Sequence, residues 1–229
     1  MRQLTLDIRA HQEPSLETFI PGDNVDAWTR AGALKDPKSF ESLYLWGTAG
    51  CGRTHLLRAT VQAALRHGRS ALYLDAGHWP QTLSLANGGL LAVDDVHLLP
   101  ADAQHQLFTL WNAARFTGLA LLIAGSAPPA DLPLREDLRT RIAQALVYQL
   151  RPLADDDLAR AIRAEANRRG MDLTHEMSAY LLRHCRRELP VLMGVLDALD
   201  EASLTLRRLP SLSLLREILN PAQSRPGPR

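Results

Sequence analysis

The sequence predicts an α/β fold built on a five-stranded parallel sheet, followed by a small all-helical subdomain. Three observations lead to this prediction. Up to Leu150, short apolar runs alternate with helical patterns, as in domains that join parallel strands through crossover helices. The first apolar run passes through a glycine-rich turn directly into a helical pattern. From Pro152 onward the strand-like runs stop, while apolar residues keep recurring at helical spacing.

The expected strands are short apolar runs of the kind that become buried on both faces of a parallel sheet. They are Leu43–Trp46, Ala71–Leu74, Leu90–Val93, Leu119–Ala124 and Leu146–Leu150. Helices separate most of them, notably His55–Leu65, which ends at the C-cap candidate Gly68, and Ala101–Phe116. Ligands of such sheets bind at the carboxyl ends of the strands, so the residues that follow these runs are the candidates for a site.

The second part of the chain has the pattern of a group of helices. Ala154 and the three aspartates after it place a cap and negative charge at the start of a helix, where its dipole favours them. Leu158, Ile162 and Ala166 give this helix an apolar face, and Gly170 ends it. Further helices are expected at Thr174–Arg187, Pro190–Leu206 and Leu212–Leu219.

Length and composition fit one domain with an accessory subdomain, since the chain has 229 residues of which 46% are hydrophobic. We divide it into a flexible tail (1–13), a base (14–151), a helical subdomain (152–219) and a second flexible tail (220–229). The net charge of +1 provides no broad basic surface for DNA. Cys51 and Cys185 fit no metal or disulfide pattern, and no signal peptide or bilayer-length apolar run is present. A soluble, cytoplasmic protein is expected.

A glycine-rich segment matches the phosphate-binding pattern G-x-x-x-x-G-K-[ST] at every defined position except one. It reads Gly47-Thr48-Ala49-Gly50-Cys51-Gly52-Arg53-Thr54. The glycines let backbone N–H groups wrap around phosphates, and the Thr54 hydroxyl is the expected ligand of Mg²⁺. The helix that follows adds the attraction of its dipole. We therefore predict a site for ADP or ATP with Mg²⁺; the alternative is an empty relic of such a loop.

The exception is Arg53, which stands where the pattern has lysine. A planar guanidinium does not take the pose of a compact ammonium between β- and γ-phosphates. Phosphate binding is therefore expected to survive, while hydrolysis is expected to suffer. The alternative is drift with retained hydrolysis, because the chain has two lysines, Lys35 and Lys38, among its 26 basic residues.

Polar residues follow two of the later strands. Asp94 is expected to hold Mg²⁺, and Asp95 to act as the acid that activates water. Taken without the glycine loop, such a pair is as often a helix cap or a turn. Ser126 is placed either to touch the γ-phosphate or the attacking water, or to shape the turn before Ala-Pro-Pro.

Two further segments indicate partners. Arg141 comes after a short helical pattern and before the fifth strand, which suits an arginine finger that enters a neighbour's nucleotide site. The alternative is a solvated surface arginine. Near the start of the chain, Gln3–Ile8 alternates apolar and polar residues. It is either an edge strand or an extended peptide that offers Gln3, Leu4, Leu6 and Ile8 to a partner's groove.

Together these motifs resemble the DnaA/Hda family of AAA+ proteins, which contains the bacterial replication initiator DnaA and regulators that shut it off. The resemblance covers nearly the whole chain and rests on Gln3–Ile8, Phe19–Asn24, Gly52–Leu57, Asp94–Asp95, Pro128–Pro129, Leu138–Arg141 and the helical subdomain. It implies an AAA+ base with a helical lid, and a peptide at Gln3–Ile8 that binds the sliding clamp. It also implies an adenine site that includes Ile20 and Pro21, a nucleotide-binding role for His55 beside the phosphate loop, and Arg141 as the finger.

The function implied by the resemblance is negative regulation of DNA replication initiation. Such a regulator sits on the DNA-loaded sliding clamp, has little ATPase activity of its own, and promotes hydrolysis of the ATP bound to DnaA. We expect no sequence-specific DNA binding, since the chain stops soon after the lid, and no membrane association; a homo-oligomer stays open. The alternatives are an autonomous AAA+ ATPase that loads a helicase, and a clamp-bound adaptor with a vestigial nucleotide site.

One departure from the family concerns the lid. The family carries a phosphate-reading arginine near the start of the third lid helix, and the matching residue here is Pro190. Arg186 and Arg187, from the preceding turn, are the candidate substitutes. Loss of a γ-phosphate contact favours ADP at the site, or a weaker dependence on nucleotide.

Overall fold

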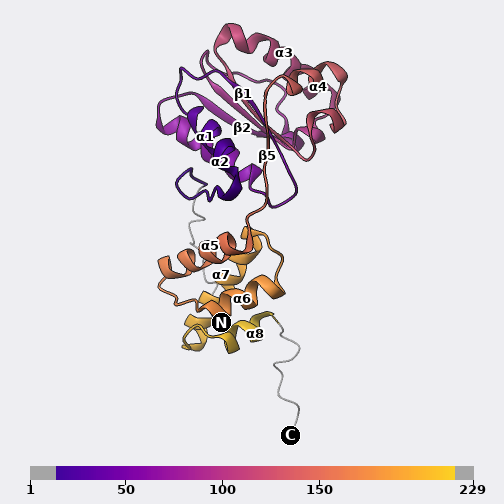
Figure 1. Ribbon diagram of the computed structural model, residues 1–229. Coiled ribbons are helices and arrows are strands. Elements are labelled where there is room, and N and C mark those ends of the chain that lie inside the picture. The colour runs from indigo at the N-terminus through magenta and orange to yellow at the C-terminus, as the bar shows by residue number, and fades with distance from the viewer. Residues whose placement is uncertain (1–13, 220–229) are drawn as a thin grey trace, which may run out of the picture. The chain divides into compact units, whose positions relative to one another are not determined.

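The computed structural model describes residues 14–219, which form two compact units (Figure 1). The first unit holds residues 14–19, Asp26–Trp46 and Arg53–Gln149. The second holds Ile20–Val25, Gly47–Gly52 and residues 150–219, so the glycine loop is grouped with the helices at the end of the chain. The Gln3–Ile8 segment lies outside the described residues.

The first unit is built on the predicted five-stranded parallel sheet, with strand order β2-β3-β4-β1-β5. Each strand lies within one or two residues of its expected range. The bounds are Ser42–Trp46 for β1, Ala71–Asp75 for β2, Leu90–Asp94 for β3, Ala120–Gly125 for β4 and Leu146–Gln149 for β5. Because β1 lies between β4 and β5, the first and last strands of the unit are neighbours.

Helices cover both faces of this sheet. Figure 1 shows α2 (Arg53–Arg66) on one side, and α3 (Ala101–Thr117) and α4 (Glu136–Ala143) on the other; α1 is Val25–Ala33. All residues of β3 and β4 are buried, as expected for central parallel strands covered twice. Leu107 of α3 and Leu138 of α4 join the core on their side of the sheet.

The second unit contains the predicted lid helices. They are α5 (Asp155–Arg168), α6 (His175–His184), α7 (Leu189–Leu206) and α8 (Leu212–Leu219), and leucines such as Leu181 and Leu196 fill the core between them. The Thr174 hydroxyl caps α6 by accepting a hydrogen bond from the Met177 N–H. Helix α6 ends three residues before the predicted Arg187, because Cys185 takes an extended conformation.

A buried arginine ties together three connections of the first unit. Arg69, between α2 and β2, is 2% exposed. Its guanidinium donates hydrogen bonds to four backbone carbonyls, those of Leu34, Asp36, Gly88 and Gly89. These carbonyls belong to the turn after α1 and to the turn that leads into β3. The carbonyls of Asp36 and Gly89 also accept the N–H groups of Ser39 and Ala120, whereas among residues 14–219 those of Leu34 and Gly88 are satisfied by Arg69.

Candidate nucleotide site and arginine finger

The sheet brings the ends of three strands to one edge. β1 ends at Trp46, which pairs with Gly125 at the end of β4, and β3 beside it ends at Asp94. The glycine loop, Asp95 and Ser126 therefore follow directly from the same edge of the sheet. This is the carboxyl edge, where parallel α/β sheets bind ligands.

The loop Gly47–Gly52 needs its glycines. A Cβ on Gly47 would lie 2.4 Å from the carbonyl oxygen of Leu150, and Gly50 and Gly52 have φ angles of 78° and 96°. Helix α2 begins at the next residue, so the N–H groups of its first turn follow the loop. Such a backbone fits an anion of phosphate size.

Arg53, the first residue of α2, faces an acid of the same unit. Its Nη2 lies 3.6 Å from Oδ1 of Asp95, and the Arg53 side chain is 14% exposed. Its Nη1 atom is buried and has no hydrogen-bond partner among residues 14–219. The guanidinium therefore balances the charge of Asp95 while keeping a donor for a further acceptor, which fits a bound phosphate. Asp95 itself takes a left-handed conformation, with φ 47°.

The next two residues, Thr54 and His55, belong to the first turn of α2. Thr54 is exposed, whereas His55 is partly buried, and its Nε2 lies 3.4 Å from the Ser15 carbonyl oxygen. The rings of His55 and Phe19 are 5.5 Å apart. Burial lowers the pKa of His55, so the imidazole is neutral near pH 7.

Asp94 is almost completely buried, with 2% exposure. Its Oδ2 accepts a hydrogen bond from the Tyr73 hydroxyl at 3.0 Å, and its Oδ1 accepts one from the Asp95 N–H at 3.0 Å. Sequence reasoning missed Tyr73, because nothing in a lone tyrosine of β2 indicates which residue of β3 it will meet. Across residues 14–219 no cluster of three or more metal-binding side chains occurs. Mg²⁺ held by Thr54 and Asp94 would thus rely on phosphate oxygens and water as well.

Ser126 is exposed at the end of β4. The turn it belongs to is held by Tyr44 of β1, whose buried hydroxyl donates to the Ala127 carbonyl at 2.6 Å. The same hydroxyl leaves no room for a side chain at Gly125, where a Cβ would approach it to 2.3 Å. Tyr44 is thus a second site-supporting residue that the sequence did not reveal.

Ile20 and Pro21 belong to the second unit and are partly buried. Close to them, the Asn24 side chain pairs twice with the backbone of Arg151, donating to its carbonyl at 2.9 Å and accepting from its N–H at 2.8 Å. These two hydrogen bonds join the Phe19–Asn24 segment, which is expected to contact adenine, to the residues just before the lid. Asn24 was not among the predicted site residues.

The lid contributes a turn that packs on the loop within the second unit. Glu188, just before α7, lies with its Cγ 2.9 Å from where a Cβ of Gly50 would be. The preceding Arg187 pairs with Asp155 at 3.4 Å. Pro190 occupies the first turn of α7, where a missing N–H is tolerated. Arg186 and Arg187 are the two candidate substitutes for the lid arginine. Of these, Arg187 is adjacent in sequence to Glu188, which packs on the loop.

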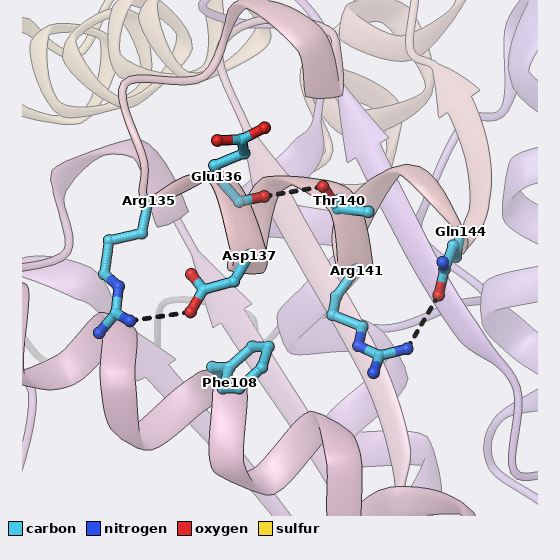
Figure 2. A pocket seen from close by; sticks show the side chains of 7 residues that line it. All are labelled: Phe108, Arg135, Glu136, Asp137, Thr140, Arg141 and Gln144. Carbon is cyan, nitrogen blue, oxygen red and sulfur yellow. Dashed lines mark hydrogen bonds and ion pairs between the residues drawn. The ribbon is translucent and has the colours of Figure 1, made fainter.

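Arg141 lies in the last turn of α4, on a hollow of about 760 Å³. Figure 2 shows its guanidinium beside Gln144, whose Oε1 accepts a hydrogen bond at 3.2 Å. Arg135 lies on the same hollow but is paired with Asp137 at 2.8 Å. The hollow is lined by Phe108, Arg135, Glu136, Asp137, Thr140, Arg141 and Gln144. Arg139 does not line it, so Arg141 is the finger candidate that the geometry favours.

The strand order, the loop between β1 and α2, the acids after β3 and the helical lid define an AAA+ nucleotide-binding protein. Residues 11–149 match the family described as bacterial DnaA ATPase domain, and residues 155–219 match the one described as Hda, lid domain. The chain therefore belongs to the DnaA-homologous AAA+ family that includes Hda. No helix within residues 14–219 is long and apolar enough to cross a membrane.

Solved structures with the same fold include DnaA proteins and variants of RuvB. Domain III of the Thermotoga maritima replication initiation protein DnaA matches with a TM-score of 0.76 at 20% identity, over 93% of this chain and 97% of that one. AMPPCP-bound DnaA from Aquifex aeolicus gives 0.72 at 20% identity, over 84% and 66%. A variant of Thermotoga maritima RuvB gives 0.72 at 16% identity, over 90% and 72%. At these identities the likeness is one of fold.

Proposed function

We propose that this protein is a negative regulator of replication initiation, which supplies Arg141 to the ATP bound by a DnaA-type initiator. The observation that carries this proposal is the placement of Arg141. It stands on an open hollow at the end of α4, and within residues 14–219 its guanidinium forms a hydrogen bond with the neutral Gln144 and no ion pair. A guanidinium with uncompensated charge is suited to phosphate oxygens, on which charge develops during hydrolysis.

The protein's own nucleotide has a different role in this proposal. The glycine loop, Arg53 and His55 bind ADP or ATP, Ile20 and Pro21 line the adenine base, and Thr54 and Asp94 hold Mg²⁺. When bound, Mg²⁺ neutralises phosphate charge and bridges phosphate oxygens. Glu188 of the lid turn lies on the loop in the same compact unit, so bound nucleotide would order the lid. AMPPCP is bound in a solved DnaA relative, which supports an adenine nucleotide as the ligand.

Little turnover is expected from the isolated protein, because Asp95 is paired with Arg53. A guanidinium beside the acid competes with the attacking water for the carboxylate oxygens. We expect Arg53→Lys to raise the turnover of the isolated protein by about tenfold or more, part of the about 10²–10⁴-fold that general acid–base catalysis contributes. ADP released from ATP in the absence of any partner measures this.

The double variant Arg53→Lys/Asp95→Asn is the control, since the gain should vanish when the acid is removed. Wild-type turnover as fast as that of autonomous AAA+ ATPases would contradict the proposal. That outcome would instead favour a helicase loader or another DnaA-like ATPase. The observation that supports this alternative is the presence of two adjacent aspartates, Asp94 and Asp95, at the end of β3. A protein that binds no nucleotide at all would favour the clamp-bound adaptor.

The sliding clamp is the proposed platform, with Gln3, Leu4, Leu6 and Ile8 as its ligand. We expect replacement of Leu6 and Ile8 by alanine to weaken clamp binding by about 2–4 kcal/mol, from loss of apolar area at about 25 cal/mol per Å². Calorimetry with purified clamp measures this, and ADP affinity serves as the internal control. Unchanged clamp binding would refute the assignment, whereas a lower thermal midpoint would support the edge-strand alternative.

A further inference from the structure

Asp94 is a buried carboxylate without a cationic partner. It is 2% exposed, and within residues 14–219 no arginine, lysine or histidine forms an ion pair with it. An ionised carboxylate that leaves water needs donors or a cation in return. Two donors meet it here, the Tyr73 hydroxyl on Oδ2 and the Asp95 N–H on Oδ1. Each carboxylate oxygen therefore keeps a further lone pair for a cation.

The position of Tyr73 follows from the register of the sheet. Tyr73 of β2 pairs with Ala92 of β3, two residues before Asp94. Since alternate residues of a strand share a face, Tyr73 and Asp94 are diagonal neighbours on one face, within reach of a long side chain. The phenol therefore meets the carboxylate from the adjacent strand, at the edge where the phosphate loop begins.

Tyr73 is itself restrained. The Arg58 guanidinium of α2 lies 4.7 Å from the centre of its ring, a cation–π distance. Its hydroxyl donates to Oδ2 of Asp94 at 3.0 Å, so the ring and the hydroxyl of Tyr73 are both engaged. Helix α2 thus holds Tyr73, and Tyr73 holds Asp94.

We propose that Tyr73 is the positioning residue of the divalent-cation site, acting through Asp94 to set the affinity of the nucleotide complex for Mg²⁺. This inference rests on the proposed nucleotide function and adds to it a residue outside the recognised motifs. Hydrogen-bond partners of metal-binding carboxylates commonly contribute about 10–100-fold to metal affinity or activity, because they orient the carboxylate. Tyr73 is placed to do the same here.

The test is the Mn²⁺ affinity of the ADP complex, measured by electron paramagnetic resonance, for the wild type and for Tyr73→Phe. We expect Tyr73→Phe to lower Mn²⁺ affinity about 10–100-fold. ADP affinity in EDTA should stay at the wild-type value, because the phosphate loop is untouched. Tyr148→Phe is the matched control, because it removes a tyrosine hydroxyl from β5, the outermost strand on the side of the sheet away from β2. It should leave the Mn²⁺ affinity and the ADP affinity unchanged.

A double variant separates positioning from a general structural effect. In the Asp94→Asn background, Tyr73→Phe should cause no further loss of Mn²⁺ affinity, since its effect passes through the carboxylate. Equal losses in both backgrounds would overturn the proposal, as would unchanged or tighter Mn²⁺ binding by Tyr73→Phe alone. Failure of the wild type to bind ADP would overturn the nucleotide function itself, and this inference with it.

Discussion

Arg141→Ala should abolish the ability of this protein to stimulate ATP hydrolysis by a DnaA-type initiator. Arginine fingers contribute about 10³–10⁵-fold to hydrolysis in other nucleotidases, so the stimulated rate should fall to the initiator's own slow rate. The fold should survive, because Arg141 is only partly buried and, among residues 14–219, its side chain forms a hydrogen bond only with Gln144. The measurement is conversion of initiator-bound ATP to ADP in the presence of DNA-loaded clamp.

Arg139→Ala is the matched control, since Arg139 is on the same helix but does not line the hollow. It should retain most of the stimulation. Arg141→Lys should rescue little, because one ammonium cannot reproduce the two parallel hydrogen bonds of a guanidinium. Full stimulation by Arg141→Ala would mean that the finger lies elsewhere, or that the regulator reshapes the initiator without contacting its ATP.

Arg69→Met should destabilise the first unit by about 2–6 kcal/mol, because a buried polar group left without its partner costs about 1–3 kcal/mol. The substitution keeps apolar volume but removes the arginine donor from four backbone carbonyls. Those of Leu34 and Gly88 are left without a donor, whereas those of Asp36 and Gly89 keep the N–H groups of Ser39 and Ala120. Two of them belong to Gly88 and Gly89, just before β3, so the turn into the strand that bears Asp94 should loosen. The urea midpoint of unfolding measures the loss.

Arg66→Met is the matched control for this prediction. Arg66 lies three residues earlier, at the end of α2, and pairs with Glu17 at 3.6 Å, with side-chain exposures of 53% and 75%. Exposed pairs of this kind contribute about 0–1 kcal/mol, so the midpoint should hardly move. A similar loss from both variants would show that the buried hydrogen bonds of Arg69 are not the source of its effect.

Much of the fold could be predicted because its determinants are local. Strands β3 and β4 are continuous apolar runs, which indicates burial on both faces. The lid helices repeat apolar residues at helical spacing, and α5 begins with three acids. The predicted end of α6 was wrong by three residues, because Cys185 takes an extended conformation and ends the helix at His184. Helix ends depend on such single residues, which periodicity does not specify.

The sequence by itself determined the class of this protein and the motif residues of its candidate site, because the glycine loop, Asp94 and Asp95 are defined by spacing along the chain. Only the tertiary structure decided which side chains support them. Tyr73 meets Asp94 through the register of β2 on β3, and Tyr44 supports the Ser126 turn because β1 lies next to β4. Strand order and register are properties of the whole sheet, so no local pattern carries these contacts.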